Sequence, residues 1–173
     1  MTQTLPLCTQ TAALPVHPVA LAIQCGGEWF GLPISHVYTV FHIEAVTPVP
    51  LAPPEILGLV NLRGQIVTVV SLRARLCMPA APTQDDMLAV AVLHAGENYA
   101  LLIDAVADVV DLESWRPIQR QPHIHPSRSA LTREVYRMAG RTIPVLDVAA
   151  LLTFTRDDSR PASHAEHGNR RQS

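Results

Sequence analysis

Residues 55–79 read EILGLVNLRGQIVTVVSLRARLCMP, and this stretch decides the fold. Two runs rich in β-branched and aliphatic residues, 57–62 and 65–71, flank the dipeptide Arg63-Gly64. A two-residue connection is typical of a tight β-hairpin, because glycine adopts the positive φ that other residues resist. A short amphipathic turn, residues 72–76, follows the second run. The stretch therefore predicts a hairpin that holds one exposed cation, Arg63, on a rigid tip, which suits protein docking better than catalysis.

Composition sets the broad class of the protein. The 173 residues fit one ordinary domain or two very small ones. The chain is 48% hydrophobic but only 5% aromatic, which predicts an aliphatic core, and its 15 prolines favour loops over long helices. A net charge of −2 argues against a dedicated nucleic-acid binder. No run of about 18 apolar residues is present, so we expect a cytoplasmic protein without direct membrane insertion.

The chain contains an internal duplication. Shifting it by 69 residues places 27–40 over 96–109 with six of fourteen positions identical, where chance gives about one. A shift of 76 residues places 64–76 over 140–152 with four identities. Ser71 and Asp147 occupy equivalent positions before a short helix, and both are good helix N-caps. The sequence thus predicts two copies of one β-unit, each of about five short strands. Such a unit closes most readily as a small barrel.

The hairpin stretch resembles the CheW-like family of chemotaxis coupling proteins. The resemblance extends from about residue 19 to 152. Its most specific part is the tip and its flanking strands, and the matching residues are Ile56-Leu57-Gly58, Val60-Asn61-Leu62-Arg63-Gly64, Leu72-Arg73 and Arg75-Leu76, with Gly31, Ile34, Val37 and Val40 upstream and 101–109 and 141–152 downstream.

The resemblance implies a fold and a division of the chain. The expected fold is all-β with few short helices: two SH3-like five-stranded β-barrels packed together and related by the duplication. We expect the CheW-like domain to span 17–155, with a first subdomain at about 17–85 and a second at about 86–155. Residues 1–16 and 156–173 lack a periodic apolar face and are expected to be disordered. Because each half is small, the two are expected to share an apolar core and unfold together.

The resemblance also implies a function. A CheW-like protein is a non-enzymatic adaptor that couples the cytoplasmic tip of methyl-accepting chemoreceptors to the regulatory domain of a histidine kinase. The pathway controlled could serve swimming or pilus-driven motility. The resemblance assigns Arg63 to receptor engagement and makes Asn61 and Gly64 the residues that set the geometry of the tip.

Three further residues are candidates for the protein-binding surface. Gly58 either allows a close backbone approach or marks a β-bulge. Val37 fits equally a core position, from its place in the repeat, and the barrel rim that meets the kinase, from the resemblance. Thr39 stands where the family commonly has glutamate, so one charge-complementary contact with the kinase is expected to be missing.

Chemistry at other positions has little support. His123 and His125 could hold a metal ion, but no third ligand lies near them in the sequence, so we expect no metal and no cofactor. Asp104 and Asp108 are expected to be solvated carboxylates. The odd number of cysteines, Cys8, Cys25 and Cys77, favours reduced thiols. Neither a nucleophile elbow nor a phosphate-binding loop is found, so the protein is not expected to be an enzyme.

Overall fold

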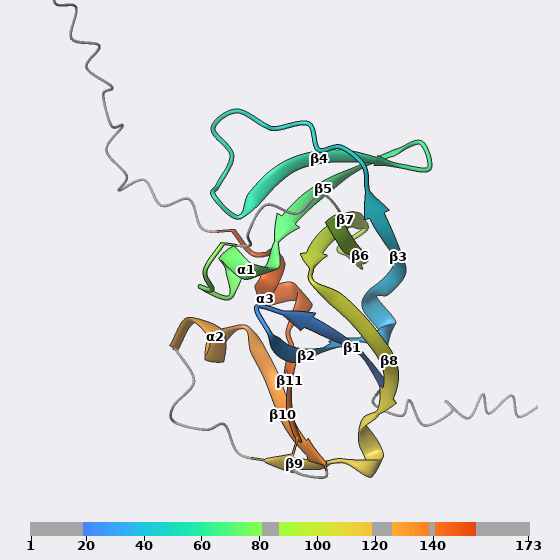
Figure 1. Cartoon of the computed structure of the whole chain (residues 1–173), viewed down its shortest axis with the longest axis vertical. Helices are drawn as coiled ribbons and strands as arrows, with labels where there is room; N and C mark the ends of the chain where they lie inside the picture. The colour runs from blue at the N-terminus through green and yellow to red at the C-terminus, as the bar shows by residue number, and fades with distance from the viewer. Residues whose placement is uncertain (1–18, 81–86, 119–125, 139–140, 155–173) are drawn as a thin grey trace, which may run out of the picture.

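The structure, a computed structural model, describes residues 19–80, 87–118, 126–138 and 141–154. Within these residues two β-sheets and a few short helices make up the molecule (Figure 1). The all-β prediction with few short helices is therefore confirmed. The expected disorder of 1–16 and 156–173 and the His123/His125 loop lie outside the described residues.

The elements follow the alternation of apolar and polar residues along the chain. The strands are β1 (Val19–Cys25), β2 (Glu28–Pro33), β3 (Val37–Ile43), β4 (Ile56–Leu62), β5 (Gln65–Ser71), β6 (Met87–His94), β7 (Glu97–Ile103), β8 (Ala105–Asp111), β9 (Arg116–Ile118), β10 (Thr132–Met138) and β11 (Arg141–Leu146). The helices are α1 (Leu72–Arg75), α2 (Pro126–Ala130) and α3 (Val148–Leu152), with 3-10 turns η1 (Ile34–His36) and η2 (Leu112–Ser114).

The five-stranded sheet has the order β3-β6-β7-β5-β4. Its two outer strands are connected through the chain that follows β3. The Thr47 N–H donates to the Leu59 carbonyl (2.9 Å), and the Leu59 N–H donates back to the Thr47 carbonyl (2.8 Å). This bridge joins the segment that follows β3 to β4, and so it connects the two edges of the sheet, as barrel closure requires.

The six-stranded sheet has the order β8-β1-β2-β11-β10-β9. Its first five strands correspond one by one, through the repeat, to β3-β6-β7-β5-β4. Strand β9 pairs with β10 through Tyr136 and Pro117. It takes a place similar to that of the Thr47 bridge in the other sheet. The SH3-like form of the two units is compatible with these orders and stays a prediction.

The duplication extends to the pairing of individual residues. In one sheet Val69 of β5 pairs in parallel with Ala100 of β7, and in the other their repeat equivalents, Val145 and Gly31, pair in the same way. Register shifts also recur, after Val37 in β3 and after its equivalent, Val106, in β8. The two sheets are therefore copies of one arrangement.

The copies exchange their leading hairpins, which differs from the expectation of one barrel per repeat. The β1–β2 hairpin comes from the first repeat but lies in the sheet of β8, β10 and β11. The β6–β7 hairpin comes from the second repeat but lies in the sheet of β3, β4 and β5. The boundary expected near residue 85 therefore does not separate the two sheets, because each contains strands from both sides of it.

Three apolar clusters form the core of the part of the chain that the structure describes. Ile43, Val67 and Val69 belong to the cluster of the five-stranded sheet, and Ile143 and Val145 to that of the six-stranded sheet. The largest cluster combines both repeats, and its fully buried members include Ile23, Leu32, Leu72, Leu76, Leu101, Ile103, Leu146 and Leu151. The prediction of a shared apolar core is confirmed, and cooperative unfolding follows as an expectation because neither half holds a complete sheet or core.

Both predicted helix caps are present. The Ser71 hydroxyl accepts a hydrogen bond from the Ala74 N–H (3.2 Å), and the Asp147 carboxylate accepts one from the Ala150 N–H (3.1 Å). Each cap satisfies an N–H group that the first helical turn leaves without an internal partner.

Arginines tie the C-terminal ends of the short helices to the other repeat. Arg75, from α1, donates to the carbonyls of Ala150 (2.8 Å) and Thr153 (3.1 Å) at the end of α3. Arg128, from α2, donates to the Leu76 carbonyl (2.8 Å) at the end of α1. Carbonyls at a helix end lack internal donors and carry partial negative charge, so these contacts stabilise both helices and the joint between the repeats.

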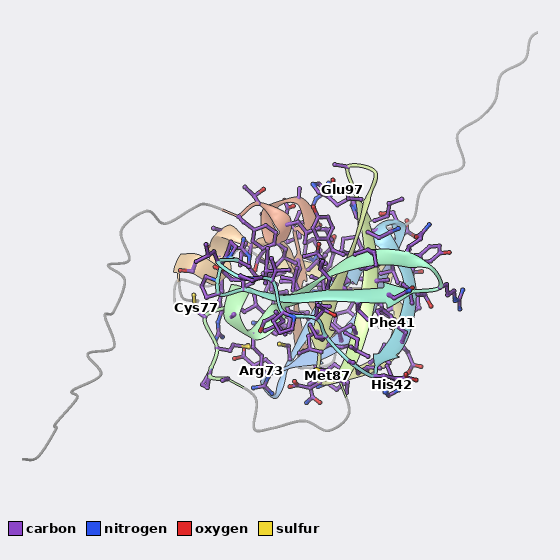
Figure 2. The ribbon with its side chains drawn as sticks, turned by 90° about the horizontal axis from the view of Figure 1, so that it is seen from above. Phe41, His42, Arg73, Cys77, Met87 and Glu97 are labelled. Atoms are coloured by element: carbon purple, nitrogen blue, oxygen red, sulfur yellow. The ribbon has the colours of Figure 1, made fainter. Side chains whose placement is uncertain are left out.

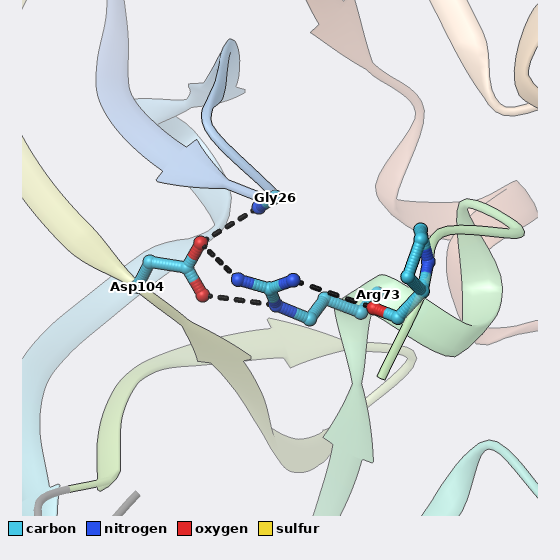
Figure 3. Close-up of polar contacts among 4 residues, drawn as sticks. Gly26, Arg73 and Asp104 are labelled. Carbon is cyan, nitrogen blue, oxygen red and sulfur yellow. Dashed lines mark hydrogen bonds and ion pairs between the residues drawn. The ribbon is translucent and has the colours of Figure 1, made fainter. Parts of the chain in front are cut away.

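A further ion pair holds the exchanged hairpins together (Figure 3). The Arg73 guanidinium donates to both carboxylate oxygens of Asp104, at 3.1 Å and 2.7 Å, and the Gly26 N–H donates to the same carboxylate at 2.7 Å. Asp104 follows β7, Gly26 lies in the β1–β2 turn and Arg73 lies in α1. The expectation that Asp104 is a solvated carboxylate was wrong, because the exchange brings two first-repeat segments against it.

Replacing Asp104 with alanine is expected to lower the free energy of unfolding by about 1–3 kcal/mol. The change leaves a largely buried guanidinium and a turn N–H without their acceptor. Urea unfolding followed by circular dichroism measures the difference, with the exposed Asp108→Ala in β8 as the matched control. Equal stability of the two variants would show that the ion pair contributes nothing.

Candidate protein-binding site

The β4–β5 connection is the two-residue turn that the sequence predicted. Leu62 and Gln65 form its closing pair, and the two residues between them both have positive φ, 53° at Arg63 and 87° at Gly64. Positive φ at both central positions matches the twist of the flanking strands. Gly64 adopts this region without strain, whereas Arg63 does so at a cost in free energy.

Asn61 fixes the turn. Its side-chain oxygen accepts a hydrogen bond from the Gly64 N–H at 2.7 Å. The bond links Asn61, in β4, to Gly64 across the turn, and so it fixes the backbone on both sides of Arg63. The structure thus gives a physical basis for the predicted geometric role of Asn61 and Gly64.

Asn61→Ala is expected to destabilise the protein by about 1 kcal/mol, since it removes one partly exposed hydrogen bond and leaves the turn less ordered. Asn61→Asp keeps the acceptor oxygen and is the matched control. The midpoint of urea unfolding measures the effect. A change as large in the aspartate variant as in the alanine variant would contradict the assigned role of the oxygen.

Arg63 is exposed, and among the described residues no hydrogen bond or ion pair holds its guanidinium. The other described arginines of this region differ. Arg73 and Arg75 are engaged with Asp104 and with α3, respectively. An exposed guanidinium on an ordered turn is free to pair with a carboxylate of another protein.

A second turn lies beside this tip. Ala95 and Gly96, between β6 and β7, have φ of 51° and 83°, the same conformation as Arg63-Gly64. The Asn98 side chain donates to Gln65 (3.0 Å), which ties the two turns together. Figure 2 shows Glu97 at the end of its turn. Sequence reasoning missed this neighbour, because only the parallel pairing of β5 with β7 brings the turns together.

The two turns border a shallow depression. It is lined by Ile66, Thr68, Gly96, Glu97 and Asn98. Ile66 stands out there, because 67% of its surface is exposed although it is aliphatic. The tip therefore combines a cation with a neighbouring apolar side chain, a pairing typical of protein interfaces.

Gly58 lies at the opposite end of β4 and is buried. Its φ is 149°, and an added Cβ would lie 2.3 Å from the Thr47 carbonyl oxygen and 2.6 Å from a Val46 methyl group. The register of β4 against β5 also shifts between Ile56 and Gly58. Both interpretations of the sequence, close backbone approach and bulge, thus apply to the same residue.

Val37 and Thr39 lie on β3, at the opposite end of the sheet order from β4. Val37 is half-buried and packs against the shared core, which favours its core interpretation. Thr39 is also half-buried, and its hydroxyl is within 3.4 Å of the Val40 carbonyl. The structure therefore groups Asn61, Arg63 and Gly64 in one place, whereas Gly58, Val37 and Thr39 lie elsewhere in the sheet.

The fold and the tip can be compared with known proteins. The family model of the CheW-like domain matches residues 20–156. That range contains both sheets and the Arg63 tip. The chain belongs to the CheW-like domain family.

Individual relatives of this CheW-like chain agree. It is 34% identical over 130 residues to the chemotaxis protein CheW of Rhizobium meliloti, covering 74% of this chain and 83% of the relative. It is 20% identical to the chemotaxis protein CheW of Bacillus subtilis, with 82% and 91% covered. The crystal structure of the scaffolding protein CheW from Thermoanaerobacter tengcongensis superposes with a TM-score of 0.67 at 25% identity, covering 78% of this chain and 91% of that one.

The remaining groups of this CheW-like domain offer little chemistry among the described residues. No cluster of three histidine, cysteine or acidic side chains there could hold a metal ion. Cys25 and Cys77 are unpaired with any described cysteine, the first buried and the second at the exposed rim after α1 (Figure 2). Burial, with a smaller effect of the Asp104 carboxylate, raises the pKa of the Cys25 thiol to about 12, so it stays protonated at neutral pH. None of the described helices has the length and apolar character of a membrane span.

Proposed function

We propose that this CheW-like protein is a non-enzymatic adaptor that couples methyl-accepting chemoreceptors to a histidine kinase. It would act in the cytoplasm, at receptor arrays that it reaches through its partners. The kinase would be held through its regulatory domain and the receptor through its cytoplasmic tip. Membership of the CheW-like family supports the chemotaxis scaffold class, and the residues of the tip support the manner of docking.

The observation that carries the proposal is the unpaired state of Arg63 on a fixed turn. The Asn61–Gly64 hydrogen bond already orders the backbone of the turn, so only the Arg63 side chain has to be ordered when its guanidinium meets a carboxylate. Preorganisation lowers the entropy lost on binding. A receptor surface with an acidic residue next to an apolar one would pair with Arg63 and Ile66 together.

An adaptor of this kind transmits a signal through changes in the relative position of its partners. It can bias the kinase only through contacts that differ between the kinase's states. The firm joint between the repeats, made by the shared core and the arginine contacts, suits this role, because a rigid body passes on a change in position without absorbing it.

The proposal is tested by reconstitution. The purified full chain is mixed with the chemotaxis histidine kinase of the same organism and with the cytoplasmic fragment of one of its receptors, and binding to each is measured separately and together. We expect the chain to bind both, and to be needed for the receptor to change the rate of kinase autophosphorylation. Failure to bind either partner would refute the proposal.

A separate experiment, in the living cell, addresses the motility output. Deletion of the gene is expected to abolish biased movement on gradients while leaving the motility machinery intact. A loss restricted to surface movement by pili, with normal swimming, would assign the adaptor to a pilus-linked chemosensory pathway.

A further inference from the structure

The loop between β3 and β4 carries an aliphatic side chain in an unfavourable position. Leu51 is fully exposed, at 104% of its reference surface, and its φ is +60°. Val49, two residues earlier, is 40% exposed. The loop lies at the top of Figure 1, outside the two packed sheets. Neither packing nor backbone conformation of this domain explains a leucine here.

The loop that carries Leu51 is held rigidly. It contains four prolines, at positions 48, 50, 53 and 54, each of which fixes a backbone angle. The Thr47–Leu59 bridge anchors its start. The Ile56 N–H donates to the Pro53 carbonyl at 2.9 Å and orders its end. The backbone around Leu51 is therefore restrained, and its side chain is exposed to solvent.

The conformation of Leu51 costs the protein stability. Glycine and asparagine adopt positive φ readily, whereas leucine does so with steric strain. An exposed leucine also gains nothing from burial in the free protein. Strain together with full exposure points to a role outside the chain's own fold.

We infer that Leu51, with Val49 beside it, is an anchor that inserts into an aliphatic pocket on a protein partner. This inference rests on the proposed adaptor function and adds a second docking point to it. Burial of a preordered aliphatic side chain in a desolvated pocket is typical of the residues that dominate interface energetics.

The charges near Leu51 indicate which side chains would surround the pocket on the partner. Residues 44–55 contain two carboxylates, Glu44 and Glu55, and no lysine or arginine. Glu44 is exposed. The Glu55 carboxylate has a cation near it, because its Oε1 lies 3.8 Å from Nη1 of Arg75, and this offsets part of its charge. A pocket rimmed by basic side chains complements this loop. An anionic lipid surface does not, because it would repel Glu44.

The location of Leu51 selects the partner. Leu51 lies in the loop before β4 and Arg63 in the turn after it, and the seven residues of β4 between them span about 20 Å. If the receptor takes the Arg63 tip, the kinase is the partner left for the Leu51 end. A coupling protein needs two such separate points to hold both partners at once.

The test compares variants of the full chain by their affinity for the purified kinase and by their thermal unfolding. Leu51→Asn removes the apolar side chain but suits positive φ, so we expect its dissociation constant to rise at least tenfold while its unfolding midpoint stays equal or increases. Leu51→Met keeps an apolar side chain and is expected to stay within threefold of the wild type. Val109→Asn, at an exposed valine of β8 in the other sheet, is the matched control and should bind like the wild type.

The outcomes separate the inference from the adaptor function. Wild-type binding to neither kinase nor receptor refutes both. Normal kinase binding by Leu51→Asn refutes only the anchor, as does a lowered unfolding midpoint, which would make Leu51 a structural residue. A loss of receptor binding alone would overturn the assignment to the kinase. Leu51-dependent binding to phosphatidylglycerol vesicles would overturn the protein pocket.

Discussion

Replacing Arg63 with glutamate is expected to weaken receptor binding strongly while leaving the fold intact. The guanidinium is exposed and engages no described residue, so its loss removes no internal contact. Glutamate at the same positive φ carries a similar backbone cost. Reversing the charge in a docked ion pair is expected to raise the dissociation constant at least about 30-fold, or about 2 kcal/mol.

The control for Arg63→Glu is Arg137→Glu. Arg137 is an exposed arginine on β10 of the other sheet, at the repeat position of Asn61, and the substitution changes the net charge equally. Arg63→Lys keeps the charge but not the two-pronged geometry, and should bind with intermediate affinity. Isothermal titration with the receptor fragment measures all three. Equal affinities of Arg63→Glu and Arg137→Glu would remove Arg63 from the interface.

Gly58→Ala is expected to destabilise the protein by about 3–5 kcal/mol, a large part of the stability of a typical domain. The added Cβ would approach the Thr47 carbonyl oxygen to 2.3 Å, at a φ that side-chain-bearing residues rarely adopt. Relief of this clash requires the Thr47–Leu59 bridge to open, and with it the link between the edges of the five-stranded sheet. Urea unfolding followed by circular dichroism measures the loss.

Gly64→Ala separates crowding from backbone conformation. Gly64 also has a positive φ, 87°, but an added Cβ there has no described atom within 4 Å. Its expected cost is therefore only about 1–2 kcal/mol. If Gly58→Ala unfolds at the same urea concentration as Gly64→Ala, crowding at Thr47 is not what requires glycine. A stable Gly58→Ala protein that fails to bind the kinase would instead restore Gly58 as a contact residue.

The two glycines show what a local pattern can and cannot predict. The dipeptide Arg63-Gly64 between two β-rich runs indicated the turn, the positive φ and the exposed cation, all of which depend on neighbours in sequence. Gly58 left two interpretations open, since the atoms that crowd it, in Val46 and Thr47, belong to a loop eleven and twelve residues away. The predicted binding roles of Gly58, Val37 and Thr39 remain predictions.

Asp104 and Leu51 also have properties that a local sequence pattern cannot predict. The duplicate alignment placed Asp104 over Ser35, a position expected to face solvent, yet the hairpin exchange brings Arg73 and Gly26 against it. Leu51 lies in the proline-rich loop between β3 and β4. Its positive φ and full exposure are properties of the folded chain.

The sequence by itself determined the β-rich class, the duplication, the two helix caps and the Arg63 turn, because each depends on residue type and short-range spacing. Tertiary structure alone decided which sheet each leading hairpin joins and which side chains meet across the joint. Because the two repeats pair their strands in the same register, β1–β2 and β6–β7 fit either sheet locally. The choice between sheets comes from connections and from the packing of the shared core, which are set only when the whole chain folds.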